Sequence, residues 1–261
     1  MSLELALSQT IASSAPVAGV RIWWLSQSGF AVRFAGGPLV TVDPCLSDAV
    51  ERLHGFKRLS LPAIAAEDLP ADWLLCTHEH ADHLDPDAVA TIARQRPSCR
   101  FIGPSSCRAG FDAAGIAEQR RQFIAAGQTL DLGGFQVQAI KADHADLAPD
   151  ALMLVLSGAG VRIAFTGDTA WNIGNFANLV EPRCDVIFAC INGGFGNMSH
   201  LDAARAIQQT APRLAIPCHF FTFSDQGTAD PLGFLHACAA LAPTTRTRLL
   251  SPGEALDVLP A

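Results

Sequence analysis

The 261-residue chain has only two lysines, Lys57 and Lys141, and its 25 acidic residues outnumber its 18 basic residues, for a net charge of −7. Proteins that bind nucleic acid usually carry a broad basic surface, so we expect no nucleic-acid partner. No apolar run approaches the roughly 18 residues of a membrane span. Residues 1–20 also lack a basic segment followed by an apolar core. We therefore expect no signal peptide, no membrane partner and a cytoplasmic location.

No C-x-x-C motif occurs among the eight cysteines, and Cys76, Cys190 and Cys218 lie in or beside apolar runs. Free cysteine is often buried, and a chain of this length needs no disulfides, so reduced thiols are expected. Flexible linkers, charge blocks and internal repeats are also absent from the sequence. These features predict one domain over residues 1–261, in which residues 1–19 are a short N-terminal extension. Homo-oligomerisation is left open.

Apolar patterning predicts strands that alternate with helices. The expected strands cover residues 20–25, 30–34, 39–42, 73–76, 100–102, 129–132, 135–142, 152–156, 162–166, 185–189, 214–217 and 248–250. The expected helices cover residues 86–95, 106–114, 171–179, 200–209 and 231–241. Residues 45–70 have no strong period and are expected to form an irregular excursion with about one helical turn. This order predicts two β-sheets packed face to face, with helices on both outer sides.

One stretch concentrates the chemistry: residues 77–85 read Thr-His-Glu-His-Ala-Asp-His-Leu-Asp. His78 and His80 alternate as on an extended backbone, so both rings can point the same way. Asp82 and His83 follow where the chain must turn, and they can face a second point nearby. Imidazoles and carboxylates suit zinc, manganese or iron, whereas a lone histidine would favour a solvated loop. Asp85 precedes a proline and is a candidate N-cap for the next helix.

Three later residues repeat one pattern, in which a potential metal ligand follows an apolar strand. They are His144, Asp168 and His219. Each alone is typical of a surface position, a cap or a turn. Because strand ends meet at one edge of an α/β fold, the three together could complete two metal sites begun by the histidine-rich stretch.

With these residues, the chain resembles the metallo-β-lactamase superfamily over about residues 20–255, and the H-x-H-x-D-H motif at 78–83 is the most specific feature. Within that superfamily it is most similar to the branch of the L-ascorbate-6-phosphate lactonases. The features that suggest this branch are Trp-Trp-Leu at 23–25, Val-Asp-Pro at 42–44, Phe-Ile-Gly-Pro at 101–104 and Ile-Pro-Cys-His-Phe at 216–220. The resemblance implies a four-layer αββα sandwich and two divalent cations, zinc or manganese, with iron as a further candidate.

The resemblance also implies a role for each of these residues. His78, His80 and His144 would bind one cation, and Asp82, His83 and His219 would bind the other. Asp168 would bridge the two, because close cations need a shared anion to limit their repulsion. The catalytic carboxylates would be Asp168 and Asp82, with Asp82 orienting a metal-bridging hydroxide and accepting its proton.

The reaction implied is hydrolysis of a small molecule, in which hydroxide attacks a carbonyl or phosphoryl centre. A lactone or ester of a small anionic substrate, such as a phosphorylated sugar acid, is favoured. The candidate contacts are His54, Lys57 and Arg58 in the excursion and the backbone at Asn192 and Gly193.

Three other functions stay open, beginning with a phosphodiesterase of the same fold. A di-iron redox protein is the second, although such proteins usually carry a flavin domain for which the chain leaves no room. A non-catalytic metal-binding or interaction protein is the third, and the complete ligand set argues against it. We expect that neither His200 nor His236 binds metal.

Overall fold

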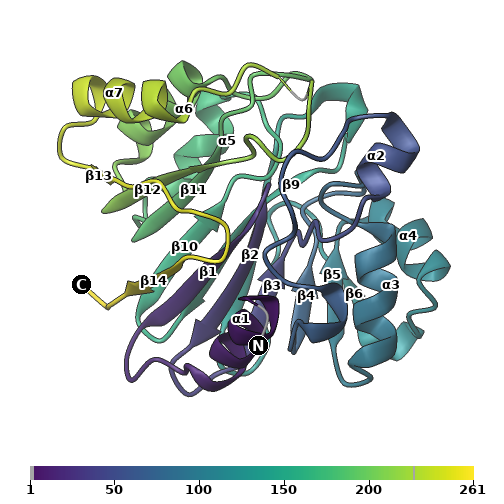
Figure 1. Ribbon diagram of the computed structural model, residues 1–261. Helices are drawn as coiled ribbons and strands as arrows, with labels where there is room; N and C mark the ends of the chain where they lie inside the picture. The colour runs from purple at the N-terminus through teal and green to yellow at the C-terminus, as the bar shows by residue number, and fades with distance from the viewer. Residues whose placement is uncertain (1–2, 226) are drawn as a thin grey trace.

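The computed structural model describes residues 3–225 and 227–261. Over these residues the strands form two mixed seven-stranded sheets (Figure 1). The first sheet has the order β14-β1-β2-β3-β4-β5-β6 and the second β13-β12-β11-β10-β9-β8-β7. The strands of the first sheet are β1 (Val20–Ser26), β2 (Gly29–Phe34), β3 (Leu39–Val42), β4 (Trp73–Leu75), β5 (Arg100–Gly103), β6 (Arg121–Phe123) and β14 (Ala255–Val258). Those of the second are β7 (Thr129–Asp131), β8 (Gln136–Lys141), β9 (Leu152–Gly158), β10 (Val161–Phe165), β11 (Val186–Cys190), β12 (Leu214–Cys218) and β13 (Arg246–Thr247).

The two sheets pack against each other through an apolar core. Alternation along β2 directs Phe30 toward the second sheet, while the next residue, Ala31, faces the outer helices. Phe30 packs on Phe188 with ring centroids 4.1 Å apart, and Phe165 stacks on Phe188 at 5.2 Å. Aromatic contacts from both sheets therefore join the two inner faces.

Helices cover both outer faces (Figure 1). Helices α1, α3 and α4 pack on the first sheet, and α5, α6 and α7 pack on the second. The helices are α1 (Leu3–Ser13), α2 (Ala49–His54), α3 (Pro86–Gln95), α4 (Arg108–Ala113), α5 (Ile173–Phe176), α6 (His200–Thr210) and α7 (Pro231–Leu241). Short 3-10 turns are η1 (Ala66–Asp68), η2 (Ser105–Cys107), η3 (Glu118–Arg120), η4 (Ala145–Leu147) and η5 (Ala177–Leu179). The predicted αββα sandwich is confirmed.

The main difference from the expected elements lies at the C-terminus. The prediction of a last strand over residues 248–250 was wrong, because the chain pairs with β12 earlier, as β13, and then leaves the second sheet. It turns at Gly253, whose N–H donates to the Trp24 carbonyl, and joins the first sheet as β14 beside β1. The sequence analysis did not predict helix α1 within the N-terminal extension or the short edge strand β6. In the excursion, α2 is longer than the single helical turn that was expected.

The structure also shows the state of the cysteines and the character of the helices. Each of the eight cysteines is buried and free. In the part of the chain that the structure describes, no helix combines the length and apolarity needed to cross a membrane.

The fold gathers the ends of several strands at one edge of the sandwich. Strands β3 and β4 run parallel in the first sheet, and β10, β11 and β12 run parallel in the second. Their carboxyl ends therefore point the same way, and the residues that follow these strands come together between the two sheets.

Candidate metal centre

The histidine-rich loop begins after β4 and ends at Asp85, which caps α3. Asp85 accepts hydrogen bonds from the N–H groups of Asp87 and Ala88, as predicted for an N-cap. The same buried carboxylate accepts N–H groups from Leu46 at 2.9 Å and Ser47 at 2.7 Å. One side chain thus ties the metal-site loop to both the next helix and the start of the excursion.

The first cluster consists of His78, His80 and His144, which offer ring nitrogens within 4.8 Å of one another. His78 Nε2 lies 3.0 Å from His80 Nδ1. Burial lowers the pKa of His78, as does the nearby His83, and burial also lowers the pKa of His144. These two rings are therefore neutral near pH 7, which is the form that binds metal.

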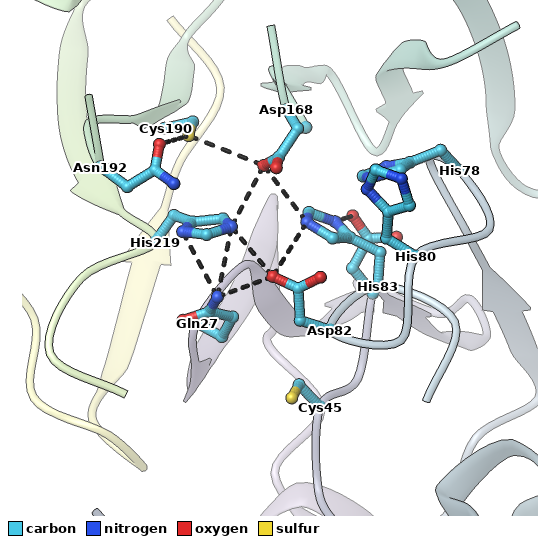
Figure 2. A network of polar contacts seen from close by, with 12 residues as sticks. Gln27, Cys45, His78, His80, Asp82, His83, Asp168, Cys190, Asn192 and His219 are labelled. Atoms are coloured by element: carbon cyan, nitrogen blue, oxygen red, sulfur yellow. Dashed lines mark hydrogen bonds and ion pairs between the residues drawn. The ribbon is translucent and has the colours of Figure 1, made fainter. Parts of the chain in front are cut away.

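The second cluster consists of Asp82, His83 and His219 (Figure 2). Asp82 Oδ2 lies 3.1 Å from His219 Nε2 and 3.7 Å from His83 Nε2. Burial opposes the charged form of each histidine, but the carboxylates Asp168 and Asp82 outweigh it. They raise the pKa of His83, and they raise the pKa of His219 to about 9. The same pairing holds the pKa of Asp82 below its usual range despite burial.

Asp168 lies between the two clusters, directly after Gly167 at the end of β10. Its Oδ1 is 3.2 Å from both His83 Nε2 and His219 Nε2, and its Oδ2 is 3.8 Å from His144 Nε2. Gly167 has φ of +55°, and a Cβ there would come within 3.0 Å of the Leu152 carbonyl oxygen and the Thr77 Cβ. Only glycine therefore lets the backbone carry Asp168 so close to the histidine-rich loop.

Further side chains orient these groups, and the buried Asp43 is one of them. Its Oδ2 lies 2.7 Å from His83 Nδ1, while its Oδ1 accepts the Thr77 N–H at 2.7 Å. Thr77 Oγ1 donates to Asp43 Oδ2 at 2.7 Å. Asn197 holds the other shared carboxylate, donating from Nδ2 to Asp168 Oδ2 at 2.7 Å. Such contacts fix the tautomer and direction of metal-binding side chains.

Gln27, in the tight turn between β1 and β2, holds two members of the second cluster (Figure 2). Its side-chain amide donates to Asp82 Oδ2 at 2.9 Å and lies 3.2 Å from His219 Nε2. Its carbonyl accepts the His219 N–H at 3.0 Å. The turn has positive φ at Ser26 and Gln27, 83° and 50°. The sequence reasoning overlooked both Gln27 and Asp43, although Asp43 directly follows a strand, as the candidate ligands do.

His80 and His144 of the first cluster, Asp82 and His219 of the second, and Asp168 form the floor of a cavity of about 210 Å³. Of the five expected substrate contacts, His54 lies in its wall. Arg58 is committed elsewhere, because its guanidinium contacts Asp48 at 3.1 Å and the Ser47 carbonyl at 2.5 Å. Lys57 is exposed, and it is joined through its backbone to Ser224. Asn192 lines a neighbouring cavity, with Gly193 beside it in the chain.

The donor set fits divalent cations. Both ring nitrogens of His144 are buried without a hydrogen-bond partner among the described residues, and so is His83 Nε2. Unpaired polar atoms of this kind are costly inside a protein, and two of them, His144 Nε2 and His83 Nε2, face the Asp168 carboxylate at 3.8 and 3.2 Å. Because the two nitrogens of an imidazole point apart, a divalent cation would take one nitrogen from each histidine, and mixed imidazole and carboxylate donors suit zinc, manganese or iron.

Comparison with known proteins agrees with this fold and donor set. The family described as "Beta-lactamase superfamily domain" matches residues 40–220. A UPF0173 metal-dependent hydrolase of Cupriavidus necator is 30% identical over 93% of this chain and 87% of its own length. Another, from Polynucleobacter asymbioticus, is 29% identical over 80% of this chain and 78% of its own. A metallo hydrolase from the archaeon Ignicoccus hospitalis has a similar fold, with a TM-score of 0.70, 21% identity, and coverage of 91% of this chain and 97% of that one.

The chain is thus a metal-dependent hydrolase of the metallo-β-lactamase fold. Within that superfamily, it belongs to the UPF0173 family. Two histidines lie outside the centre: His200 is the first residue of α6, and His236 is exposed on α7. That neither binds metal stays a prediction.

Proposed function

We propose that this hydrolase is dinuclear and opens the lactone or ester bond of a small molecule. In this proposal His78, His80 and His144 hold one cation, and Asp82, His83 and His219 hold the second. The position of Asp168 carries the proposal, because its carboxylate faces histidines of both clusters at 3.2–3.8 Å. A carboxylate shared in this way would offset the repulsion between two nearby cations.

Two bound cations would supply an acidified water, which ionises near neutral pH, together with positive charge for a developing oxyanion. The residues of the chain hold and orient this chemistry. Asp82 lies at the cavity floor and is proposed to orient the water and take its proton. Gln27 fixes one oxygen of that carboxylate, and Asn197 fixes one oxygen of Asp168.

The resemblance to the L-ascorbate-6-phosphate lactonases, on the residues quoted above, supports a lactone or ester bond. A phosphorylated sugar acid would need cationic contacts, which were expected from Lys57 and Arg58. Neither lines the cavity, and Arg58 is paired within the excursion. We therefore limit the proposal to the type of bond that is cleaved. The same centre could act on a phosphodiester, so the test includes that substrate class.

The test replaces Asp168 with Ala and with Asn, then measures metal content beside hydrolysis of lactone, ester and phosphodiester panels. We expect both variants to fold, because the apolar sandwich supplies most of the stability. Asp168→Ala should lose one or both metals, and activity should fall by orders of magnitude because an activated water is lost. Asp168→Asn should retain more metal than Asp168→Ala. It should still be nearly inactive, since the amide is neutral.

Asp131→Ala is a matched control, because Asp131 is an exposed carboxylate on β7 at the edge of the second sheet. It should change neither metal content nor activity. Two metals and near-normal turnover in Asp168→Ala would show that the centre does not work as proposed. Activity on phosphodiesters alone would contradict the proposed lactone or ester substrate, but it would be compatible with the proposed dinuclear centre.

A further inference from the structure

Above the metal centre, the cavity has walls that are mainly apolar. Val50 and Phe56 contribute from α2 and the excursion, Leu147 from η4, and Phe195 from the glycine-rich loop after β11. The volume of about 210 Å³ is below the range of roughly 300–1,000 Å³ found for drug-sized ligands. The cavity therefore suits a small substrate with apolar groups beside the reacting bond.

Positive charge is scarce on these walls. Among the described residues that line the cavity there is no lysine or arginine, and His54 is the one ionisable side chain outside the two clusters and Asp168. An anionic group placed against Phe56 and Phe195 would lose part of its water, and His54 is the one side chain of these walls that could pair with it, so its burial there is unfavourable. The walls thus select against a charged substituent placed away from the centre.

Both walls are anchored to the metal centre itself. On one side, the start of the excursion bonds to Asp85 through Leu46 and Ser47. On the other side, the loop that carries Phe195 is held by Asn197, which donates to Asp168. The cavity is therefore built as one unit with the centre, so an apolar group bound against these walls would be held in a defined place relative to the cations.

Phe195 is the most unusual of the wall residues. The residue is 50% exposed, and its backbone has φ of +55°. An exposed aromatic ring is unfavourable in water, and a bulky residue with positive φ is strained. Its ring meets that of Phe56 edge-on, with centroids 5.8 Å apart. The two rings thus touch across the two loops, and an apolar group bound over this pair would cover part of both rings.

We propose that the substrate carries a small uncharged apolar group, which lies against Phe56 and Phe195 while the reacting carbonyl faces the metal centre. This inference rests on the proposed hydrolysis for the identity of the reacting bond. It differs from the sugar-acid expectation, because recognition comes from apolar contact rather than from a cation on the excursion.

Hydroxamic acids test the inference independently of turnover, because the hydroxamate group binds a metal centre and is not a hydrolase substrate bond. Binding of acetohydroxamic, hexanohydroxamic and succinic monohydroxamic acid to the metal-loaded protein is measured by calorimetry. Each buried CH₂ group should strengthen binding by about fourfold. The hexano compound has four more CH₂ groups than the aceto compound, so burial of only two of them should make it bind at least about tenfold more tightly. The anionic succinic compound should show no such gain.

Phe195→Ala should remove most of the hexano preference without changing metal content or acetohydroxamic acid binding. Phe221→Ala is a closely matched control, since Phe221 is also exposed, at 63%, and also has positive φ, 57°. It lines the neighbouring cavity rather than this one, so the hexano preference should persist.

Kinetics with a hexanoate and an acetate ester of one leaving group should follow the same order, with the loss in Phe195→Ala appearing in KM. Equal binding of the aceto and hexano compounds, or tighter binding of the succinic compound, would overturn the inference. A retained hexano preference in a protein that cleaves no ester or lactone would instead leave the apolar site standing and reject the proposed function.

Discussion

Replacing Asp43 with Asn would keep the shape of the side chain but exchange one carboxylate oxygen for an amide group. In the structure both oxygens face groups that can donate, with His83 Nδ1 at 2.7 Å from one and the Thr77 N–H at 2.7 Å from the other. An acceptor here keeps the His83 proton on Nδ1, which leaves Nε2 free to bind a cation. In Asp43→Asn, either orientation of the amide turns an NH₂ group toward one of these donors.

The less costly result is a change of tautomer, in which His83 accepts at Nδ1 and carries its proton on Nε2. That nitrogen faces Asp168 and Asp82, and because this is the only proton left on the neutral ring, binding a cation would require its return to Nδ1 or its complete loss. Loss of a hydrogen-bond partner of this kind typically lowers metal affinity by about 10- to 100-fold, or about 1.4–2.8 kcal/mol. The effect should fall on the second cluster, because Asp43 bonds directly to none of the first cluster.

A competition titration against a chromophoric chelator would resolve the two binding constants. Asp185→Asn is the matched control, since Asp185 is a mostly buried carboxylate that accepts the Arg162 N–H at 2.8 Å and pairs with Arg213 at 2.6 Å. It precedes β11, at the opposite end from the centre. We expect one weakened and one unchanged constant in Asp43→Asn, and two unchanged constants in Asp185→Asn. Unchanged affinity for both cations in Asp43→Asn would refute this reasoning.

Two further predictions concern the second cluster. Gln27→Ala should weaken the second cation by about tenfold, because Asp82 and His219 both lose the same contact; the same titration checks this, and equal weakening at both clusters would contradict it. Metal uptake at pH 7 should release protons mainly from the second cluster. There the pKa of His83 is raised and that of His219 is raised to about 9, so both rings carry a proton that a cation would displace. In the first cluster burial lowers the pKa of His78 and of His144. Calorimetry in buffers of different ionisation enthalpy measures this release, and a heat of binding that is independent of the buffer would exclude it.

The architecture and the centre's location could be inferred from sequence because both follow local rules. Apolar runs marked most of the strands, and a polar residue after each marked the edge at which their ends meet. The structure brings His144, Asp168 and His219 to the histidine-rich loop from three separate strand ends. Their roles as ligands remain predictions, but their proximity follows from the strand directions in the second sheet: β10 and β12 are joined through parallel pairing with β11, and β8 runs the same way because it and β10 both pair antiparallel with β9.

The supporting residues carried a weaker signal. Asp43 occupies a strand end like the candidate ligands, but an acid before a proline is also typical of an ordinary turn. Gln27 lies in a hairpin turn, where a polar residue is unremarkable, and only the pairing of β1 with β2 directs its amide to Asp82. Their contribution depends on contacts between residues far apart in the chain, which periodicity does not report.

Arg58 shows why the cavity walls were harder to infer than the centre. In sequence it is a cation in an irregular segment, which favours a role in binding anions. In the structure the same segment folds back on itself. The guanidinium of Arg58 contacts the Ser47 carbonyl, the Asp48 carboxylate and the ring of Phe223. The donors of the centre are set by strand ends, whereas the walls are set by how two loops fold over it. The sequence therefore predicts the type of chemistry more directly than the specificity for substrate. Specificity should be tested at the apolar residues of those two loops rather than at their charged residues.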